Sequence, residues 1–439
     1  MHTKKIPLVI LGFLSPLIAW ASPNFYSSGT SSTMGHSSVA HHLLSVSNNP
    51  AAQELVLAKG DKFRMAFLGS AGFNIEYGDI DNFQDELDDV LDLLDEGNVT
   101  LQDADSTVDR FNAVLVSMGN AGYFRFGGDV RVPGLPIVFR SELLRGTVSL
   151  DASLDFLAKG SVLDSPLSFA FNGSDVDFQT SSALYLKGAS MTRIGLGYSR
   201  PVWEQRSGKF QGKLLAGSRL NVYSMKLSKQ IIGFDTIGDN EVSDIVKDEY
   251  DKNETATTAA GLDAGVIWQA SRYQVGLTLS NINQPSFAYG AVGLSCETLT
   301  STARDNCYVA QTNVNSGRIK ANEEHEMSAI STVDASLLVT SNWSLTSSAD
   351  LAKYNDPVGD EVQYFSLSTT HTPSMRWIPA WRVGYRANLA GEKLSQLGLG
   401  TTLLGIVNMD VAYGLQSTTV DGSSVPRALG FNVGFEQRF

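Results

Sequence analysis

The sequence predicts an all-β fold, a transmembrane outer-membrane β-barrel of about 14 antiparallel strands with a small helical insert. Three observations predict it: an export signal at the N-terminus, repeated segments in which apolar and polar residues alternate, and an aromatic residue, Phe439, at the end of the last such segment. We expect a signal peptide at residues 1–21, a separate N-terminal segment at 22–62 and the barrel at 63–439, in the outer membrane of a Gram-negative bacterium.

The first residues have the three parts of a secretory signal. Lys4 and Lys5 form a basic start, residues 6–20 are largely apolar, and Ala19-Trp20-Ala21 is a small-x-small cleavage site. A retained anchor helix is the alternative, but the run is shorter than the ~20 residues that span a bilayer and contains two prolines. The mature chain is therefore expected to leave the cytoplasm.

Charge and composition exclude one class of partner. The chain has 33 Lys and Arg against 46 Asp and Glu, a formal net charge of -13, so nucleic acid binding is not expected. Only 18% of the residues are charged, against about a quarter in an ordinary soluble domain, and there are 40 glycines.

The closing segment, LGFNVGFEQRF, alternates with a period of two, as a strand with unlike faces does. One face carries Leu429, Phe431, Val433, Phe435 and Phe439. A terminal aromatic on such a strand resembles the recognition signal of bacterial outer-membrane barrels, so Phe439 is a candidate signal for the barrel-assembly machinery.

The same alternation recurs along the chain and predicts the other strands. In WRVGYRANL, for example, Trp381, Val383 and Tyr385 alternate with Arg382 and Arg386. Many segments run about nine to twelve residues, which suits a tilted crossing of lipid better than the alternative, a soluble β-sandwich. The fifteen candidate segments are 63–77, 129–143, 146–157, 177–187, 190–201, 209–228, 255–270, 272–282, 326–340, 342–353, 360–371, 379–390, 396–407, 408–417 and 427–439. Bacterial barrels have even strand numbers, so one assignment is wrong. The two open points are 63–77, which is either a plug or a strand, and residues 165–173, which are a further strand candidate.

The connections alternate between short turns and long loops, as they do in outer-membrane barrels. The longest, at 283–325, is polar and holds both cysteines, Cys296 and Cys307. In an oxidising compartment such a pair is expected to form a disulfide that closes a surface loop. A metal site is the weaker alternative, because no histidine or third cysteine lies near in sequence.

Residues 79–122 have helical rather than strand periodicity. Phe83, Leu87, Leu91 and Leu94 recur at three- and four-residue spacing, and a second amphipathic stretch follows. We expect two packed helices inserted into or beside the barrel. The acidic run lacks the glycine of a calcium-binding loop, so it is interpreted as a solvated face.

Candidate functional groups fall on the polar faces of the predicted strands. Asp350, Arg382, Arg386 and Asp410 each alternate with apolar neighbours, so we expect them to face the lumen, either as functional charges or as a structural ion-pair network. His36, His41 and His42 are interpreted as incidental, with no metal and no cofactor expected. No nucleophile elbow, zinc-protease or phosphate-loop motif occurs, so we expect no enzymatic activity.

The segment SSTMGHSSVAHHLLSVSNNPAAQEL resembles the start of the FadL-like outer-membrane transporters, through its glycine-containing turn and the motif Asn49, Pro50 and Ala51. That resemblance implies that residues 22–62 form a hatch in the lumen and that a hydrophobic small molecule passes through the barrel. The acidic insert departs from this pattern, since an acidic mouth repels a carboxylate ligand.

The blocks at 261–287, 342–356 and 381–391 resemble the plasmid-transfer TraF-like outer-membrane proteins, whose barrels are related to the FadL-like group. This resemblance covers most of residues 25–439 and implies an accessory to conjugal transfer or cell-envelope machinery. Three functions stay open: that accessory role, a channel for hydrophobic compounds, and a structural or adhesive barrel. The expected partners are outer-membrane lipid, the barrel-assembly machinery and either envelope proteins or a hydrophobic small molecule.

Overall fold

The computed structural model describes residues 31–39, 42–43, 45–58, 60–96, 101–171, 176–208, 211–237, 253–375, 377–420 and 422–437. The predicted signal peptide at 1–21, the predicted assembly signal Phe439, and His41 lie outside these residues.

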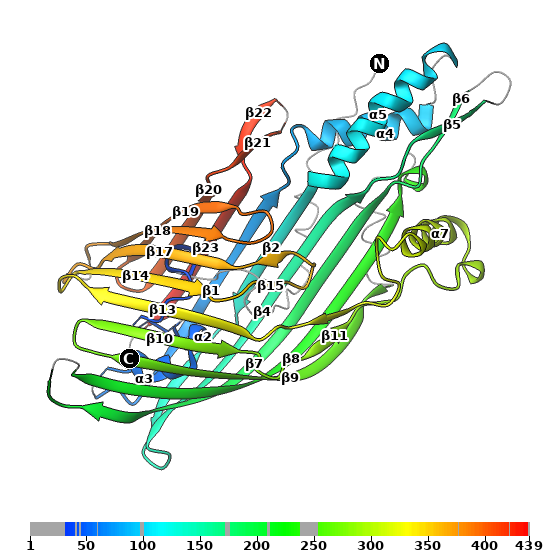
Figure 1. The fold of residues 1–439 in the computed structure, drawn as a ribbon. Helices are drawn as coiled ribbons and strands as arrows, with labels where there is room; N and C mark the ends of the chain where they lie inside the picture. Colours follow the sequence, from blue (N-terminus) through cyan, green and yellow to red (C-terminus); the bar gives the residue numbers. More distant parts are fainter. Residues whose placement is uncertain are drawn as a thin grey trace.

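Within this part of the chain, a closed antiparallel barrel of 14 strands forms the body of the molecule (Figure 1). Consecutive barrel strands pair with each other, and β1 pairs with β23. The strands are β1 (Phe63–Tyr77), β2 (Tyr123–Arg131), β4 (Gly146–Leu163), β7 (Ala183–Gln205), β8 (Gly212–Gly233), β9 (Thr255–Gln269), β10 (Tyr273–Ser280), β13 (Ile330–Leu338), β14 (Trp343–Asp350), β17 (Tyr364–His371), β18 (Ala380–Asn388), β19 (Ser395–Leu403), β20 (Val407–Gly414) and β23 (Ala428–Gln437).

One position around the barrel is filled by two strand pieces. After β2, the chain leaves the sheet at residues 132–136 and returns as β3 (Ile137–Ser141), and both pieces pair with β1 on one side and β4 on the other. The Gly134 amide donates to the Phe67 carbonyl at 3.0 Å across the break. The predicted strand 129–143 therefore corresponds to an interrupted strand that begins earlier.

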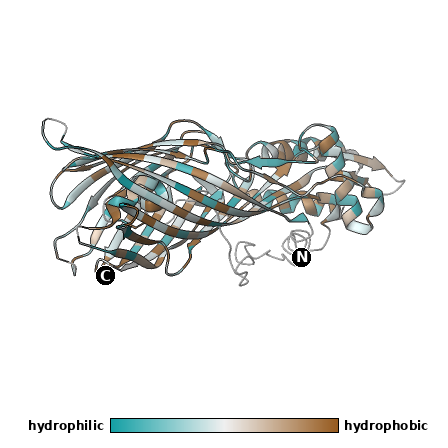
Figure 2. Ribbon diagram, turned by 90° about the horizontal axis from the view of Figure 1, so that it is seen from below, coloured by the Kyte–Doolittle hydropathy of each residue, from teal (hydrophilic) through white to brown (hydrophobic). Residues whose placement is uncertain are grey.

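The strand faces differ as the alternation predicts. Trp381 is 39% exposed, whereas Arg382, the next residue, is 2% exposed and faces the lumen. Along the strands of Figure 2 the ribbon changes repeatedly between hydrophobic and hydrophilic colours. The exposed apolar residues of the barrel wall include Leu150, Ile194, Leu196, Leu220, Val222, Leu262, Val266, Val275, Leu277, Leu337, Leu345, Leu367, Val383, Tyr385, Leu397, Leu399, Met409, Val411, Tyr413 and Leu429. Such an apolar outer wall is typical of a barrel in a bilayer, and the protein is an outer-membrane barrel.

The two ends of the barrel are unequal (Figure 1). One end, beside the described C-terminus, has short connections such as Ala270–Arg272 and Leu404–Ile406. The other end carries the longer helices and the long loops. By the rule for outer-membrane barrels, the short turns are periplasmic and the long loops extracellular. No helix among the described residues is long and apolar enough to cross a membrane.

At the extracellular end, β4, β7 and β8 extend into a three-layered structure. These strands have 18, 23 and 22 residues, more than a bilayer crossing needs. The helices α4 (Phe83–Glu96) and α5 (Leu101–Ala121) pack on one face through Val162, Leu184 and Ile232. Helix α7 (Ser301–Asn315) packs on the opposite face, through Leu163, Ala183 and Ile231. We call this part, made of β4, β7, β8, α4, α5 and α7 beyond the lipid-facing wall, the extracellular platform.

The platform explains the strand that was miscounted. The segments predicted at 177–187 and 190–201 belong mostly to one long strand, β7, in which small residues at 188–190 break the alternation. Within the described residues, the remaining elements of the long loops are four hairpins and two short 3-10 helices. They are β5 (Ser168–Phe171) with β6 (Val176–Gln179), β11 (Ser286–Ala288) with β12 (Glu324–Glu326), β15 (Tyr354–Asn355) with β16 (Glu361–Val362), β21 (Ser417–Val420) with β22 (Ser423–Pro426), η3 (Phe234–Thr236) and η5 (Cys296–Thr298).

Candidate functional site

The lumen is occupied by the N-terminal part of the chain, which we call the luminal segment (residues 31–39, 42–43 and 45–58) (Figure 1). It consists of short helical turns that pack against the inner wall. These are α1 (Ser31–Met34), α2 (Ser45–Asn48), η2 (Pro50–Ala52) and α3 (Gln53–Val56).

The predicted motif Asn49, Pro50 and Ala51 lies at the centre of this segment. Asn49 caps η2, since its side-chain oxygen accepts from the Ala51 amide at 2.9 Å. Pro50 occupies the first turn, where an N–H group would have no partner within the helix, so its missing N–H costs no hydrogen bond. The Asn49 amide nitrogen lies 3.4 Å from the Leu277 carbonyl oxygen on β10. The motif therefore both starts the turn and fixes it to the wall.

Glycines on the inner wall make room for this turn. A Cβ built on Gly217 of β8 would lie 2.5 Å from the Pro50 carbonyl carbon, and one on Gly265 of β9 would overlap the Asn49 side chain. On the far side of the barrel, a Cβ on Gly384 would overlap the Thr33 backbone. Side chains at these positions would displace the segment, so the many glycines on the polar strand faces serve the fit between the segment and the wall.

Arg219 of β8 holds the end of α2. Its guanidinium donates to the carbonyl oxygens of Val46 at 2.8 Å and Ser47 at 3.1 Å, where a helix end leaves carbonyls unpaired. Asp263, directly opposite on β9, accepts from the same guanidinium at 2.8 Å and keeps this buried charge paired. Sequence reasoning missed this pair, although Asp263 falls on the polar face of a predicted strand, because the partner depends on the register between two strands.

Of the four predicted lumen charges, Arg382 and Asp410 form an ion pair, and this pair contacts the luminal segment through Asp410. They lie on β18 and β20, on either side of Gly400, and form a fully buried ion pair at 2.9 Å. Gly400 is needed between them, since a Cβ there would lie 2.9 Å from the Arg382 Nε. Asp410 also accepts from the Thr33 hydroxyl at 2.8 Å, which ties α1 to this pair.

Asp350 and Arg386 lie apart from that pair, towards the extracellular mouth. Asp350 accepts from the Tyr364 amide at 2.9 Å and the Thr332 hydroxyl at 2.8 Å, so it is a structural acceptor at the strand ends. Arg386 stacks on the Tyr364 ring, with its guanidinium carbon 3.7 Å from the ring centre. Another pair that sequence reasoning missed, Arg193 with Asp151 at 2.5 Å, lies deeper on the β4–β7 wall.

A small polar cavity remains between the luminal segment and the loops above it. Its volume of about 40 Å³ admits roughly three water molecules. Ser47, Arg219 and Tyr223 line its floor and walls, and His325 and Tyr354 come from the loops. In the part of the chain that the structure describes, no group of three or more His, Cys, Asp or Glu side chains is placed to hold a metal.

The β11–β12 hairpin covers this cavity from the extracellular side. Phe287 and Met327 pack with Tyr223 in a buried cluster, and the two rings of Tyr223 and Phe287 meet edge to face at 6.4 Å. Burial, followed by the charge of Lys187, lowers the pKa of His325 on this hairpin to about 4, so its imidazole is neutral near pH 7.

A family described as "F plasmid transfer operon, TraF, protein" matches residues 46–350, which include about half of the luminal segment and the whole platform. The chain belongs to this family. The match confirms the TraF-like resemblance expected from the sequence.

Two solved structures resemble this TraF-family chain over nearly its whole length. A FadL homologue from Pseudomonas aeruginosa is 12% identical, with a TM-score of 0.42 over 95% of this chain and 99% of that one. The toluene transporter TodX from Pseudomonas putida is 10% identical, with a TM-score of 0.46 over 96% and 100% of the two chains. No curated protein matches this TraF-family sequence.

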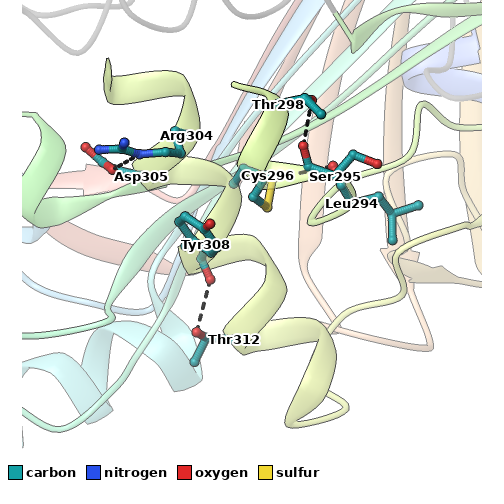
Figure 3. The surroundings of a disulfide bond; sticks show 9 residues. Leu294, Ser295, Cys296, Thr298, Arg304, Asp305, Tyr308 and Thr312 are labelled. Atoms are coloured by element: carbon teal, nitrogen blue, oxygen red, sulfur yellow. Dashed lines mark hydrogen bonds and ion pairs between the residues drawn. A yellow bond between two sulfur atoms is a disulfide. The ribbon is translucent and has the colours of Figure 1, made fainter. Parts of the chain in front are cut away.

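The predicted disulfide of this TraF-family barrel is formed on the platform (Figure 3). Cys296 in η5 is fully buried and joins Cys307 in α7, with 5.4 Å between the two Cα atoms. Helix α7 lies in the loop predicted as 283–325, where no helix was expected. The disulfide fixes the first half of α7 to the turn before it.

Proposed function

We propose that this TraF-family barrel is a non-enzymatic accessory to conjugal transfer or cell-envelope machinery and that its extracellular platform contacts a partner protein. The observation that carries the proposal is the combination of a lumen filled by the chain's own N-terminal segment with strands that extend into a three-layered surface structure. A pore needs no such platform, whereas a docking protein does. The family's description, which names a plasmid transfer operon, agrees with this role.

Deletion of the gene tests this proposal. Donor cells that lack it are expected to mate less often or to show altered envelope assembly, and wild-type protein supplied in trans restores the phenotype. Unchanged mating and envelope assembly, together with lost uptake of a small molecule, would contradict the accessory role.

A second candidate is a gated channel for hydrophobic small molecules, in which residues 22–62 act as a hatch. The observation that favours it is that the luminal segment does not join the sheet. Its Thr33 and Asn49 side chains contact the wall, and Arg219 of the wall contacts its backbone. Purified protein in liposomes is expected to take up a radiolabelled aromatic hydrocarbon faster than empty liposomes. Equal rates would count against the channel.

Assembly needs two further features that we propose on sequence grounds. Residues 1–21 are removed on export, and Phe439 engages the barrel-assembly machinery before the strands insert among outer-membrane lipids. Loss of Phe439 is expected to reduce the heat-modifiable, faster-migrating form of the protein in outer-membrane fractions. An undiminished folded band would contradict that role for Phe439.

A further inference from the structure

Three consecutive turns at the periplasmic end of the barrel are apolar. They follow β13, β17 and β19, which with β14, β18 and β20 form one continuous part of the sheet. We call their exposed apolar residues the apolar rim: Leu338, Val339, Met375, Trp377, Ile378, Leu403, Leu404 and Ile406. The turn after β7 at the same end is polar, and the Arg206 side chain in it is 84% exposed. Water therefore suits the β7–β8 turn and does not suit the rim.

The backbone of Leu404 shows that the apolar character of the rim has a cost. Leu404 and Gly405 form the two-residue turn between β19 and β20, and both have positive φ, 54° and 67°. Such a turn favours asparagine, aspartate or glycine at its first position, because a bulky side chain is strained in the left-handed region. Leu404 is nevertheless 60% exposed, so packing inside the protein does little to offset this strain. A contact outside the chain would offset it.

The strands above the rim are too short to span the hydrocarbon region alone. β18 has 9 residues and β20 has 8, whereas β8 has 22. On β18 and the residue after it, the exposed apolar residues extend from Trp381 to Leu389, and the charged Glu392 follows. That run rises about 20 Å along the membrane normal for a strand tilted by roughly 40°. Because outer-membrane barrels have an apolar band of about 25 Å, the rim supplies the missing height.

The rim is continuous with the apolar outer wall. Trp343 is the first residue of β14 and Trp381 the second of β18, and their rings meet edge to face at 4.9 Å. The Val339 amide of the rim donates to the Trp343 carbonyl at 2.9 Å, directly beside this aromatic pair. One apolar surface therefore runs from the wall, across the two tryptophans and onto the turns.

The turn backbones of the rim are suited to an apolar surrounding. The Ile406 amide donates to the Leu403 carbonyl at 2.9 Å, and the Ile378 amide donates to the Met375 carbonyl at 3.1 Å. Lipid offers no hydrogen-bond partners to a backbone, so a turn that enters the hydrocarbon region has to pair its own polar groups. These bonds reduce the number of polar groups that the rim would bring into lipid.

We infer that the apolar rim lies among the phospholipid acyl chains of the inner leaflet of the outer membrane, whereas the β7–β8 turn lies in water. The rim extends the apolar outer wall, and its height matches the length that the short strands lack. Turns at one end of the barrel then sit at unequal depths, which a tilt of the barrel or a local thinning of the leaflet accommodates. This lipid contact is independent of whether the barrel is an accessory protein or a channel.

The test places a fluorescent nitrobenzoxadiazole label on single cysteines in the full protein. The variants are Leu404→Cys in the rim and Ser207→Cys in the β7–β8 turn, which is the matched control at the same end. Each is reconstituted into nanodiscs of phosphatidylcholine, in which water reaches both faces. Iodide quenches a label in water, and phosphatidylcholine with a doxyl group on an acyl chain quenches a label in lipid. Wild type, whose two cysteines form the disulfide, is the labelling control, and heat-modifiability establishes folding.

The label at Leu404→Cys is expected to be quenched severalfold more by the doxyl lipid and severalfold less by iodide than the label at Ser207→Cys. Met375→Cys, on the neighbouring turn, is expected to behave like Leu404→Cys and carries the test if that variant does not fold. Equal iodide quenching at the two sites would overturn the inference. Protection from iodide without quenching by the doxyl lipid would also overturn it, because a second copy of the chain or another protein would then cover the rim.

Leu404→Asn gives a second test that needs no label. Asparagine suits the positive φ at this position, so in water the substitution would stabilise the turn. In lipid, the loss of an apolar contact and the entry of an amide group outweigh that gain. The variant is therefore expected to unfold at a lower denaturant concentration than wild type in phosphatidylcholine vesicles. An equal or higher midpoint would contradict the position in lipid.

Discussion

Gly217 shows how a single residue lets the luminal segment occupy the barrel. We predict that Gly217→Ala displaces Pro50, because its Cβ would lie 2.5 Å from that backbone, at an overpacking cost of about 1–3 kcal/mol. Thermal unfolding and protease protection of the N-terminus measure the effect. The control is Gly128→Ala on β2, whose Cβ would meet one atom at an ordinary 3.4 Å. Equal protection in the two variants would contradict the tight fit.

The buried pair of Arg382 and Asp410 gives a second prediction for single residues. Arg382→Gln leaves a buried carboxylate unpaired, which costs about 3–5 kcal/mol of unfolding free energy. The double variant Arg382→Gln with Asp410→Asn removes both charges and is expected to regain much of this stability. Denaturant titration of Arg382→Gln, Asp410→Asn and the double variant measures the coupling. Independent, additive losses would show that the two residues do not act as a pair.

At the scale of elements, the disulfide and α7 form one unit. Replacing Cys296 and Cys307 by serine removes a cross-link that restricts the unfolded chain. For a closed loop this short, the lost restriction is expected to lower the stability of the η5–α7 segment by about 3 kcal/mol. Limited proteolysis should then cut residues 283–325 earlier while the barrel stays heat-modifiable. Unchanged cleavage would indicate that packing on β7 and β8 alone holds α7.

The β11–β12 hairpin and the chain before it should loosen in acid. Burial and Lys187 lower the pKa of His325 to about 4, so its stabilising contribution is full above pH 6.5 and is lost as the pH falls towards 4. For Glu323, burial raises the pKa but the charges of Lys187 and Lys229 outweigh it, so the pKa is lowered. Its contribution is full above its ordinary pKa of about 4.5 and is lost as the pH falls through the lowered value.

Hydrogen exchange of β11 and β12 between pH 7.5 and pH 4 measures this loosening. The ionisable groups that act on His325 or Glu323 are Lys187, Lys229 and Tyr185, and both lysines lie over the Tyr289 ring. In His325→Gln the change between pH 6.5 and 4.5 is expected to disappear, while the loss below pH 4.5 that Glu323 contributes stays. Glu323→Gln should leave the change between pH 6.5 and 4.5 in place. An unchanged pH profile in His325→Gln would contradict the assignment.

Element by element, the sequence predicted what depends on local pattern. The segment 63–77 coincides with β1, and most other predicted strands match to within a few residues. The failures are elements that depend on tertiary contacts: β7 was divided in two, and α7 was not recognised because its apolar face is short and packs on a platform that only the long strands create.

For the candidate site, sequence patterns placed Arg382 and Asp410 on lumen faces but could not pair them. Their meeting depends on the register of β18, β19 and β20 and on the missing side chain of Gly400. The stacking of Arg386 on Tyr364 similarly depends on neighbouring strands. The roles of Asn49, Pro50 and Ala51 as a hatch and of Phe439 in assembly stay predictions.

On the scale of the whole molecule, this outer-membrane TraF-family barrel has a lumen that its own N-terminal segment closes. The measurement that tests this most directly is ion conductance of the purified protein in planar bilayers, with heat-modifiability of the same sample establishing that it is folded. Folded wild-type protein is predicted to show no steady conductance, because the luminal segment is fixed across the barrel by contacts to β20, β10 and β8. Large, stable conductance steps from folded wild-type protein would contradict a closed lumen.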